Sequence, residues 1–274
     1  MKGTIYPAIW FSEAAKEAFQ DYVAIFPNSR VIESNPVVVS AKLNGVPFIG
    51  INGGPYFKPN PAISFMVTCE TGEEIDRLWE MIVEDGEVLM PLDSYPWSPY
   101  YGWISDKNNV SWQLYLGTLE NLNDQAIVPT LVFCGAQQGK CKEAISFYKS
   151  VFRDFTDEGS MSYPDGDRQG QILQWQFVVN GLTLMAADSA EDHDFSFNEA
   201  LSFVIPCESQ TEIDYYWAAM TERGEESRCG WCKDPYGVSW QIVPHNIDEL
   251  LRNNPAANKA LMRMNKISIA DLMI

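Results

Sequence analysis

The chain of 274 residues is 46% hydrophobic and 13% aromatic, which is enough apolar material for one large or two ordinary globular domains. Its 37 acidic residues exceed its 19 basic residues, and the formal net charge of -18 repels phosphate backbones and anionic lipids, so we expect neither nucleic acid nor a membrane as partner. No long apolar segment or secretory leader is recognisable, and the six cysteines therefore favour reduced thiols and a cytoplasmic location.

The chain begins with a predicted strand and a predicted helix. Residues 5–11 (IYPAIWF) are rich in β-branched and aromatic side chains, as strands are. Apolar residues then recur at helical spacing over residues 15–26, and Ser12 is placed to cap this helix at its N-terminus.

A hairpin and a second helix follow. Residues 37–51 contain two strands around Asn44-Gly45, a dipeptide typical of tight hairpin turns. The strand at 63–69 (ISFMVTC) leads into a second amphipathic helix, which we expect Gly86 to end. Further strands are predicted between residues 87 and 116, so the whole stretch has an α+β pattern with antiparallel sheet.

The same order of elements then recurs in the second half of the chain. GW and VSWQ stand at residues 102–103 and 110–113 and again at 230–231 and 238–241, at a constant offset of 128 (230 − 102). SFMVTCE in the first half likewise corresponds to SFVIPCE in the second. Such regular self-similarity indicates a tandem duplication.

We therefore predict two homologous domains, at residues 1–117 and 127–246. A polar linker at 118–126 joins them, and a helical tail at 247–274 has no counterpart in the first half. The chain is then an intramolecular pseudo-dimer, and a further homodimer stays open.

Four stretches of the sequence carry a family resemblance: FSEAAKEAFQDYVAIFPNSRV, EEIDRLWEMIVEDGEVLMPLDSYPWSPYYGWISDKNNVSWQL, KDPYGVSWQI and the tail MNKISIADL. They resemble the vicinal oxygen chelate superfamily, also called the glyoxalase/bleomycin resistance/dioxygenase fold. The closer match is its PhnB-like branch, labelled the "3-demethylubiquinone-9 3-methyltransferase" domain. The resemblance covers nearly the whole chain, twice. It implies an α+β fold of two tandem glyoxalase-like domains, each of paired βαβββ modules that form a curved, antiparallel-rich sheet with helices on the outside.

The resemblance also bears on metal binding. In metal-using members, ligands come from first strands and last strands of the modules, and the corresponding positions here are Pro7, Pro129, Ala62, Ala200, Gln113 and Gln241. Proline and alanine offer no lone pair to a divalent ion, and two neutral amides do not replace three ligands. The two histidines, His193 and His245, lie elsewhere. We therefore expect no metal and no other cofactor.

The methyltransferase label has little support in the residues. A common S-adenosylmethionine site needs a Gly-rich turn between a strand and a helix. The dense glycine cluster GINGG (50–54) lies in a hairpin region with no helix after it, so we expect no methyltransferase activity.

The two halves have diverged in their loops. The first half has a long segment at 88–103, which shortens to 225–231 in the second, whereas 163–177 forms a hairpin that the first half lacks. This is either neutral loop drift or a sign that one pocket, or a composite of both, has been kept while its twin was closed.

The candidate ligand-binding residues are an aromatic run and several amides and hydroxyls. Trp112 and Trp240 alternate with Gln113 and Gln241, so we expect the tryptophans under the helices and the glutamines on the concave side. Ser111 and Ser239 should share the glutamine side, and the amides of the second half should line a second cup. The full set is Trp97, Tyr100, Tyr101, Trp103, Ser111, Gln113, Gln174, Gln176, Ser239 and Gln241. No catalytic residue is identified.

These features favour metal-independent binding of a small organic molecule in a cupped aromatic pocket. Two alternatives remain. One is an isomerase or lyase whose acid and base are unidentified, and the other is a structural pseudo-dimer whose cups are filled by side chains.

The CGWC motif at 229–232 has the spacing of a redox dithiol. In the repeat it aligns with YGWI, a strand, on which residues i and i+3 lie about 10 Å apart and on opposite faces. A disulfide needs Cα atoms within about 7 Å, so we predict two free thiols on different faces.

Overall fold

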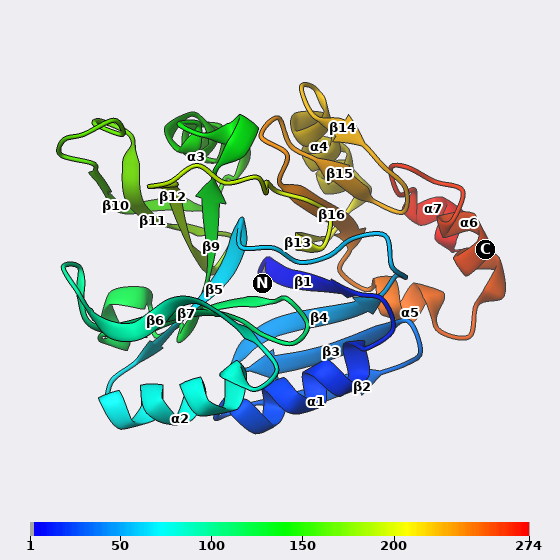
Figure 1. The fold of residues 1–274 in the computed structure, drawn as a ribbon. Helices are drawn as coiled ribbons and strands as arrows, with labels where there is room; N and C mark the ends of the chain where they lie inside the picture. Colours follow the sequence, from blue (N-terminus) through cyan, green and yellow to red (C-terminus); the bar gives the residue numbers. More distant parts are fainter. Residues whose placement is uncertain (1–2, 274) are drawn as a thin grey trace.

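The computed structural model describes residues 3–273 and contains two eight-stranded mixed sheets (Figure 1). Sheet A has the order β14-β15-β16-β13-β1-β4-β3-β2, and sheet B has the order β10-β11-β12-β9-β5-β8-β7-β6. The strands of sheet A are β1 (Tyr6–Phe11), β2 (Arg30–Ser34), β3 (Val38–Leu43), β4 (Val46–Asn52), β13 (Leu201–Cys207), β14 (Glu225–Glu226), β15 (Trp231–Lys233) and β16 (Ser239–Pro244). Those of sheet B are β5 (Ile63–Cys69), β6 (Glu87–Tyr95), β7 (Ser98–Ser105), β8 (Ser111–Leu116), β9 (Ile127–Phe133), β10 (Phe155–Ser162), β11 (Ile172–Val179) and β12 (Leu182–Asp188).

Four longer helices pack on the sheets, and three short ones end the chain. They are α1 (Ala15–Ile25), α2 (Gly72–Val83), α3 (Cys141–Val151), α4 (Gln210–Thr221), α5 (Ile247–Leu251), α6 (Pro255–Leu261) and α7 (Ile269–Leu272), with 3-10 turns η1 (Leu119–Leu122) and η2 (Gly135–Gln137). In Figure 1, α1 and α2 lie together on one side of the molecule and α3 and α4 on the other. None of the helices described combines the length and hydrophobicity needed to span a membrane.

Each sheet takes one βαβββ module from each half of the chain. In sheet A, β1 pairs antiparallel with β13 of the second half, and Tyr6 lies opposite Val204. In sheet B, β5 pairs antiparallel with β9, and Ser64 lies opposite Thr130. The duplicated glyoxalase-like α+β fold is confirmed, and the structure adds that its two sheets interlock the halves.

A single hydrophobic core joins the helix-facing sides of both sheets. Phe48 of sheet A and Phe65 of sheet B meet with ring centroids 5.1 Å apart. Trp112 and Trp240 are fully buried in this core, in ring contact with Phe26 of the α1 C-terminus and Phe152 of the α3 C-terminus respectively. The predicted placement of both tryptophans under the helices is confirmed.

Two buried aspartates link neighbouring modules. Asp106, in the β7–β8 turn, accepts hydrogen bonds from the Tyr22 hydroxyl at 2.7 Å and the Trp112 indole at 2.9 Å. Asp234, in the β15–β16 turn, makes the equivalent bonds to Tyr148 and Trp240 at 2.7 and 3.0 Å. Burial raises the pKa of both carboxyls, although the bonds from the two side chains and two backbone amides oppose that rise. Asp106 and Asp234 therefore hold tyrosine and tryptophan side chains in the core in addition to shaping their turns.

The start of α1 and the end of α2 both differ from the sequence prediction. Ser12 does not cap α1, because the side-chain oxygen of Asn52, at the end of β4, accepts from the Ala15 N–H at 2.9 Å instead. Gly86 is not the left-handed residue after α2, since Asp85 has φ +58°. A Cβ at Gly86 would lie 2.6 Å from the Ser105 carbonyl oxygen, so close packing explains this glycine.

The hairpins also refine the sequence prediction. Asn44 and Gly45 have φ of +46° and +82°, as the predicted tight turn requires. The hairpin that the first half was expected to lack exists as β2 and β3, joined by residues 35–37, and its counterpart in the second half has the longer connection 163–171. This hairpin was not predicted because β2 is a short edge strand with every residue exposed, and it therefore lacks the alternation of buried and exposed side chains that indicates a strand.

Candidate functional site

Each sheet has a face turned away from helices α1 to α4. We call the side of sheet A that bears Ala8, Val204 and Val243 face A, and the side of sheet B that bears Ser64, Thr130 and Gln113 face B. The two faces occupy equivalent places in the duplicated fold, and each could hold a pocket. The segments and side chains that cover each face therefore show which of the two is more open to a ligand.

The C-terminal tail covers one end of face A. Ala257, Ile267 and Leu272 of the tail form a buried apolar cluster with residues of face A. The N–H groups of Cys229 and Gly230 donate to the carbonyls of Met264 and Asn265, each at 2.8 Å, and fix the tail to the sheet. Figure 1 shows the three short tail helices gathered beside sheet A.

Aromatic side chains occupy the other end of face A. Trp10 makes edge-to-face contacts with Phe57 and Trp231, at centroid distances of 5.2 and 5.9 Å, and its indole donates to the Gly54 carbonyl at 2.7 Å. Gln241 is 7% exposed and donates to Ser202 at 3.0 Å. Ser239 Oγ is buried without a partner among the described residues.

Trp10 and Phe57 were not among the sequence candidates. Trp10 shares strand parity with Tyr6 and Ala8, and that signal could have placed it on face A. Phe57 lies in a loop, where no periodicity indicates its direction.

Face B gathers part of the predicted aromatic and amide group. The Tyr101 hydroxyl donates to Gln113 Oε1 at 2.8 Å, and Gln113 Nε2 donates to Ser64 Oγ at 2.6 Å. The Trp103 indole donates to Ser111 Oγ at 2.6 Å. Tyr101 is 6% exposed and Gln113 is 9% exposed, and burial raises the pKa of Tyr101 well above its ordinary value. Trp103 is half-buried.

Tyr100 and Trp97 do not lie inside this group. Tyr100 points to the opposite side of β7, where its hydroxyl donates to the Asp76 carboxylate of α2. Trp97 lies at the tip of the β6–β7 hairpin, 57% exposed, and stacks on Tyr95 with ring centroids 5.1 Å apart. Its ring also meets Tyr101 at 6.2 Å, so Trp97 forms the rim of face B.

Gln174 and Gln176 belong to the same sheet as Gln113, so the expectation that they line a second cup is wrong. Both lie on β11 and are half-buried. Gln176 Nε2 donates to the Asn121 carbonyl and to a Glu158 carboxylate oxygen, at 2.7 and 2.6 Å. Gln174 Nε2 has a sulfur acceptor at 3.2 Å, Met185 Sδ, which is a weak partner.

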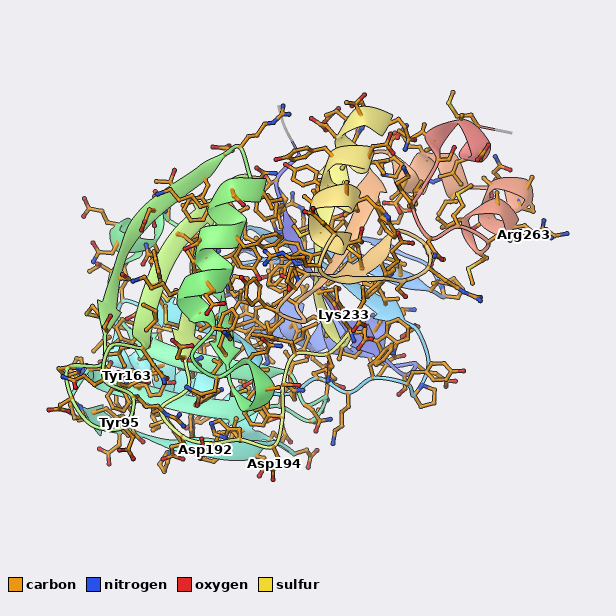
Figure 2. The ribbon with its side chains drawn as sticks, turned by 90° about the horizontal axis from the view of Figure 1, so that it is seen from above. Tyr95, Tyr163, Asp192, Asp194, Lys233 and Arg263 are labelled. Atoms are coloured by element: carbon orange, nitrogen blue, oxygen red, sulfur yellow. The ribbon has the colours of Figure 1, made fainter. Side chains whose placement is uncertain are left out.

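A short linker takes the place of the tail on face B. Leu122 of η1 packs with Met66, Val128 and Met185 in a small buried cluster. In Figure 2, Tyr95 lies at the same edge of the molecule as Tyr163, of the β10–β11 connection, and Arg263 of the tail lies far away at the other end.

The positions expected for metal ligands need correction. Pro7 and Pro129 share strand parity with core residues such as Ile9 and Leu131 and so face the helices. The neighbouring positions on the glutamine side are Ala8 on face A and Thr130 on face B. The side chains beside the two glutamines are serines, and not the expected Ala62 and Ala200. Gln113 donates a hydrogen bond to Ser64, and Gln241 donates one to Ser202.

The polar side chains gathered around Gln113 on face B are therefore hydroxyls and neutral amides. Such a set does not fit zinc or another transition metal, since these ions are held by imidazole, thiolate or carboxylate ligands. Within residues 3–273 no cluster of three or more His, Cys, Asp or Glu side chains could hold a metal ion.

The CGWC motif is not a dithiol site in the structure. Cys229 and Cys232 are both free thiols. Cys232 lies on β15 in the helix-side core, whereas Cys229 precedes the strand in a turn, with φ +59°, and its sulfur lies 3.5 Å from the Leu261 carbonyl of the tail. The free thiols are as predicted, but the strand assignment of Cys229 is wrong.

Two surface clefts lie away from these faces. One, of about 820 Å³, lies between α3 and residues 169–172, and the other, of about 710 Å³, lies between the end of α1 and the start of α2. Neither is lined by Gln113 or Gln241.

The chain belongs to the family described as 3-demethylubiquinone-9 3-methyltransferase, whose model matches residues 3–115 and 125–243. Because the model matches once in each half, the chain is a tandem duplication of this domain. A comparison with functionally curated proteins returns no match.

The chain is also similar to several solved structures. The chain is 37% identical to a putative 3-demethylubiquinone-9 3-methyltransferase, PhnB protein, from Bacillus cereus, over 41% of this chain and 98% of that one, with a TM-score of 0.39. Glyoxalase I from Zea mays is similar over 91% of this chain and 95% of its own, with 10% identity and a TM-score of 0.58. Its V278E mutant has the same coverage and identity and a TM-score of 0.60. The maize enzyme therefore supports the fold alone.

The glycine cluster at 50–54 has packing roles. A Cβ at Gly50 would lie 2.6 Å from the Phe19 ring of α1, and one at Gly53 would lie 2.0 Å from the Trp10 ring. The next regular element after β4 is the strand β5, so this segment has no strand–turn–helix arrangement. The absence of methyltransferase activity stays a prediction.

Proposed function

We propose that this protein binds a small organic molecule on face B, without a metal ion. The observation that supports this is the asymmetry of two equivalent faces. Face A is occupied by the tail and by Trp10, Phe57 and Trp231. The chain has a tail after its second half only, and on face B the short linker leaves Trp103 and Gln174 half-buried.

The side chains of face B favour a flat molecule with a polar group. Trp103 and Tyr101 offer aromatic surface for stacking. The amide of Gln174, held only by a thioether, is available to bond a carbonyl or hydroxyl group of the ligand. Gln113 already has both its amide groups engaged and would orient Tyr101 rather than contact the ligand.

Trp97 controls access to this face in the proposal. Its side chain is largely in water and contacts only other aromatic rings among the contacts described, so moving it costs little buried area. A ligand that enters would displace Trp97 from Tyr101 and insert beside it.

The structural pseudo-dimer remains the second candidate, because Tyr101 and Gln113 are buried and hydrogen-bonded to each other. No comparable observation favours the enzyme. The carboxyls of Asp106 and Asp234 have pKa values raised by burial, but both are bonded to tyrosine and tryptophan on the helix side.

A fragment screen by ligand-observed NMR tests the proposal, using flat aromatic amides and phenols with the wild type, Trp103→Ala and Trp231→Ala. Trp231 occupies the equivalent position on face A and is the matched control. We expect fragments that bind the wild type and the Trp231 variant and bind Trp103→Ala about tenfold more weakly. Binding that is indifferent to Trp103, or an absence of binding, would favour the pseudo-dimer.

A further inference from the structure

The surface cleft beside α3 combines basic and aromatic side chains in a protein that is acidic as a whole. It has a volume of about 820 Å³ and is lined by Lys142 and Phe147 of α3, by Gln169–Ile172, and by Arg223 and Tyr236 of two turns. We call it the α3 cleft. It is separate from face B, because α3 packs on the opposite side of sheet B.

The duplicated sequence shows that the rings and the guanidinium of the cleft belong to the second half only, whereas Lys142 corresponds to Lys16 of the first half. Phe147 corresponds to Asp21 at the offset of 126 that relates α3 to α1, and Arg223 corresponds to Asp85 at the offset of 138 that relates α4 to α2. In the first half Asp21 instead forms an ion pair with Lys107, at 2.8 Å. The second half has therefore replaced two acids by a ring and a cation.

The aromatic surface of the cleft is arranged around the cation. The Arg223 guanidinium lies 5.8 Å from the centroid of the Phe147 ring. Tyr236, which is Asn108 in the first half, contacts Phe147 with centroids 6.0 Å apart. Arg223 also lies beside the Tyr236 hydroxyl and opposes the rise in pKa that burial gives this group. Two rings and a guanidinium thus line one cleft.

The positive charges of the cleft are not neutralised by its acids. Glu143 is paired with Lys140 at 2.9 Å. The Asp188 carboxylate is buried and turned inward, accepting from the N–H groups of Cys141 and Ile172 at 3.1 and 2.8 Å. Within the described residues, no ion pair engages Lys142 or Arg223. Lys142 and Arg223 are therefore available to an anionic ligand, although the chain as a whole carries a net charge of -18.

We propose that the α3 cleft binds a small aromatic carboxylate. The carboxylate interacts with the Arg223 guanidinium and the Lys142 ammonium, since guanidinium offers paired donors to a planar carboxylate. The ring of the ligand packs against Phe147 and Tyr236. The loop 163–171, which is extended only in the second half, forms one wall.

The test uses the full chain and the probe 2-naphthoate, with its neutral analogue 2-naphthamide, followed by isothermal calorimetry and amide chemical shifts. We expect 2-naphthoate to shift the amides of residues 169–171 and to bind about tenfold more tightly than 2-naphthamide. Arg223→Asp and Phe147→Asp, which restore the residues of the first half, should each weaken 2-naphthoate about tenfold.

Three further measurements separate this site from the alternatives. Lys142→Gln, at an exposed position of α3, should weaken 2-naphthoate and not 2-naphthamide. Arg153→Gln, a control at a cation that lies over Tyr215 instead, and Trp103→Ala on face B should leave binding unchanged. Equal affinity for the two probes, shifts confined to face B, or no effect of Arg223→Asp and Lys142→Gln would overturn the proposal. Since Trp103→Ala addresses face B alone, failure of one site does not decide the other.

Discussion

The Tyr22–Asp106 hydrogen bond joins a helix on sheet A to a turn of sheet B, so the phenol is both buried and bonded to a carboxylate. We predict that Tyr22→Phe lowers the free energy of unfolding by about 1.5–3 kcal/mol, the usual worth of a bond to a charged group. Urea denaturation measures this change. Tyr56→Phe is the control, because Tyr56 is 78% exposed and its replacement should change stability by less than about 0.5 kcal/mol. Equal stability of the two variants would contradict a role for the bond.

Cysteine reactivity provides a second test at the scale of single residues. Five of the six free cysteines are buried, and only Cys229 is partly exposed. Burial raises the pKa of Cys134 to about 11 and that of Cys69 to about 12, so these thiols also lack thiolate at neutral pH. We predict that a disulfide reagent at pH 8 modifies one thiol in the native protein and six after unfolding. Cys229→Ala should abolish the native reaction, and rapid modification of that variant would show that another cysteine is accessible.

At the scale of elements, the tail is the segment that distinguishes face A from face B. Ile267 is fully buried between face A and Gly230. We predict that Ile267→Ala costs about 2–5 kcal/mol of stability, as for other fully buried aliphatic residues. Hydrogen exchange should also accelerate in α6 and α7 before it does in β13. Met273→Ala, at a side chain 72% exposed, is the control and should behave as the wild type. Unchanged exchange in the Ile267 variant would mean that the tail does not depend on this contact.

At the scale of the whole molecule, the two halves cannot complete either sheet alone. The central pairs β1–β13 and β5–β9 both cross between halves. We predict that residues 1–117 and 118–274, expressed together as separate chains, copurify as a 1:1 complex with the tryptophan fluorescence of the intact protein. Each fragment expressed alone should be a homodimer or unfolded. A stable folded monomer of either fragment, by light scattering and circular dichroism, would contradict the interlocked topology.

The sequence determined the repeat and the α+β class, because strand and helix periodicities and the turn at Asn44-Gly45 are local properties of the chain. The paired βαβββ modules were expected from the family resemblance and not from these local patterns. It also placed Trp112 and Gln113 on opposite faces, since alternation along a strand needs no tertiary information. It did not reveal β2, which is an exposed edge strand. It also did not reveal that Asn52, and not Ser12, accepts the hydrogen bond at the start of α1, because Asn52 lies on a distant strand.

Only the tertiary structure decided which candidates belong together. Tyr101, Trp103 and Gln113 share face B with Gln174, because β7, β8 and β11 are in one sheet, whereas Gln241 lies on face A. The strand pairs that cross between the halves, such as Ser64 with Thr130 and Tyr6 with Val204, are selected by burial of the whole core, and no local pattern encodes that choice. The same holds for the tail, whose covering of face A makes face B the better candidate for a ligand.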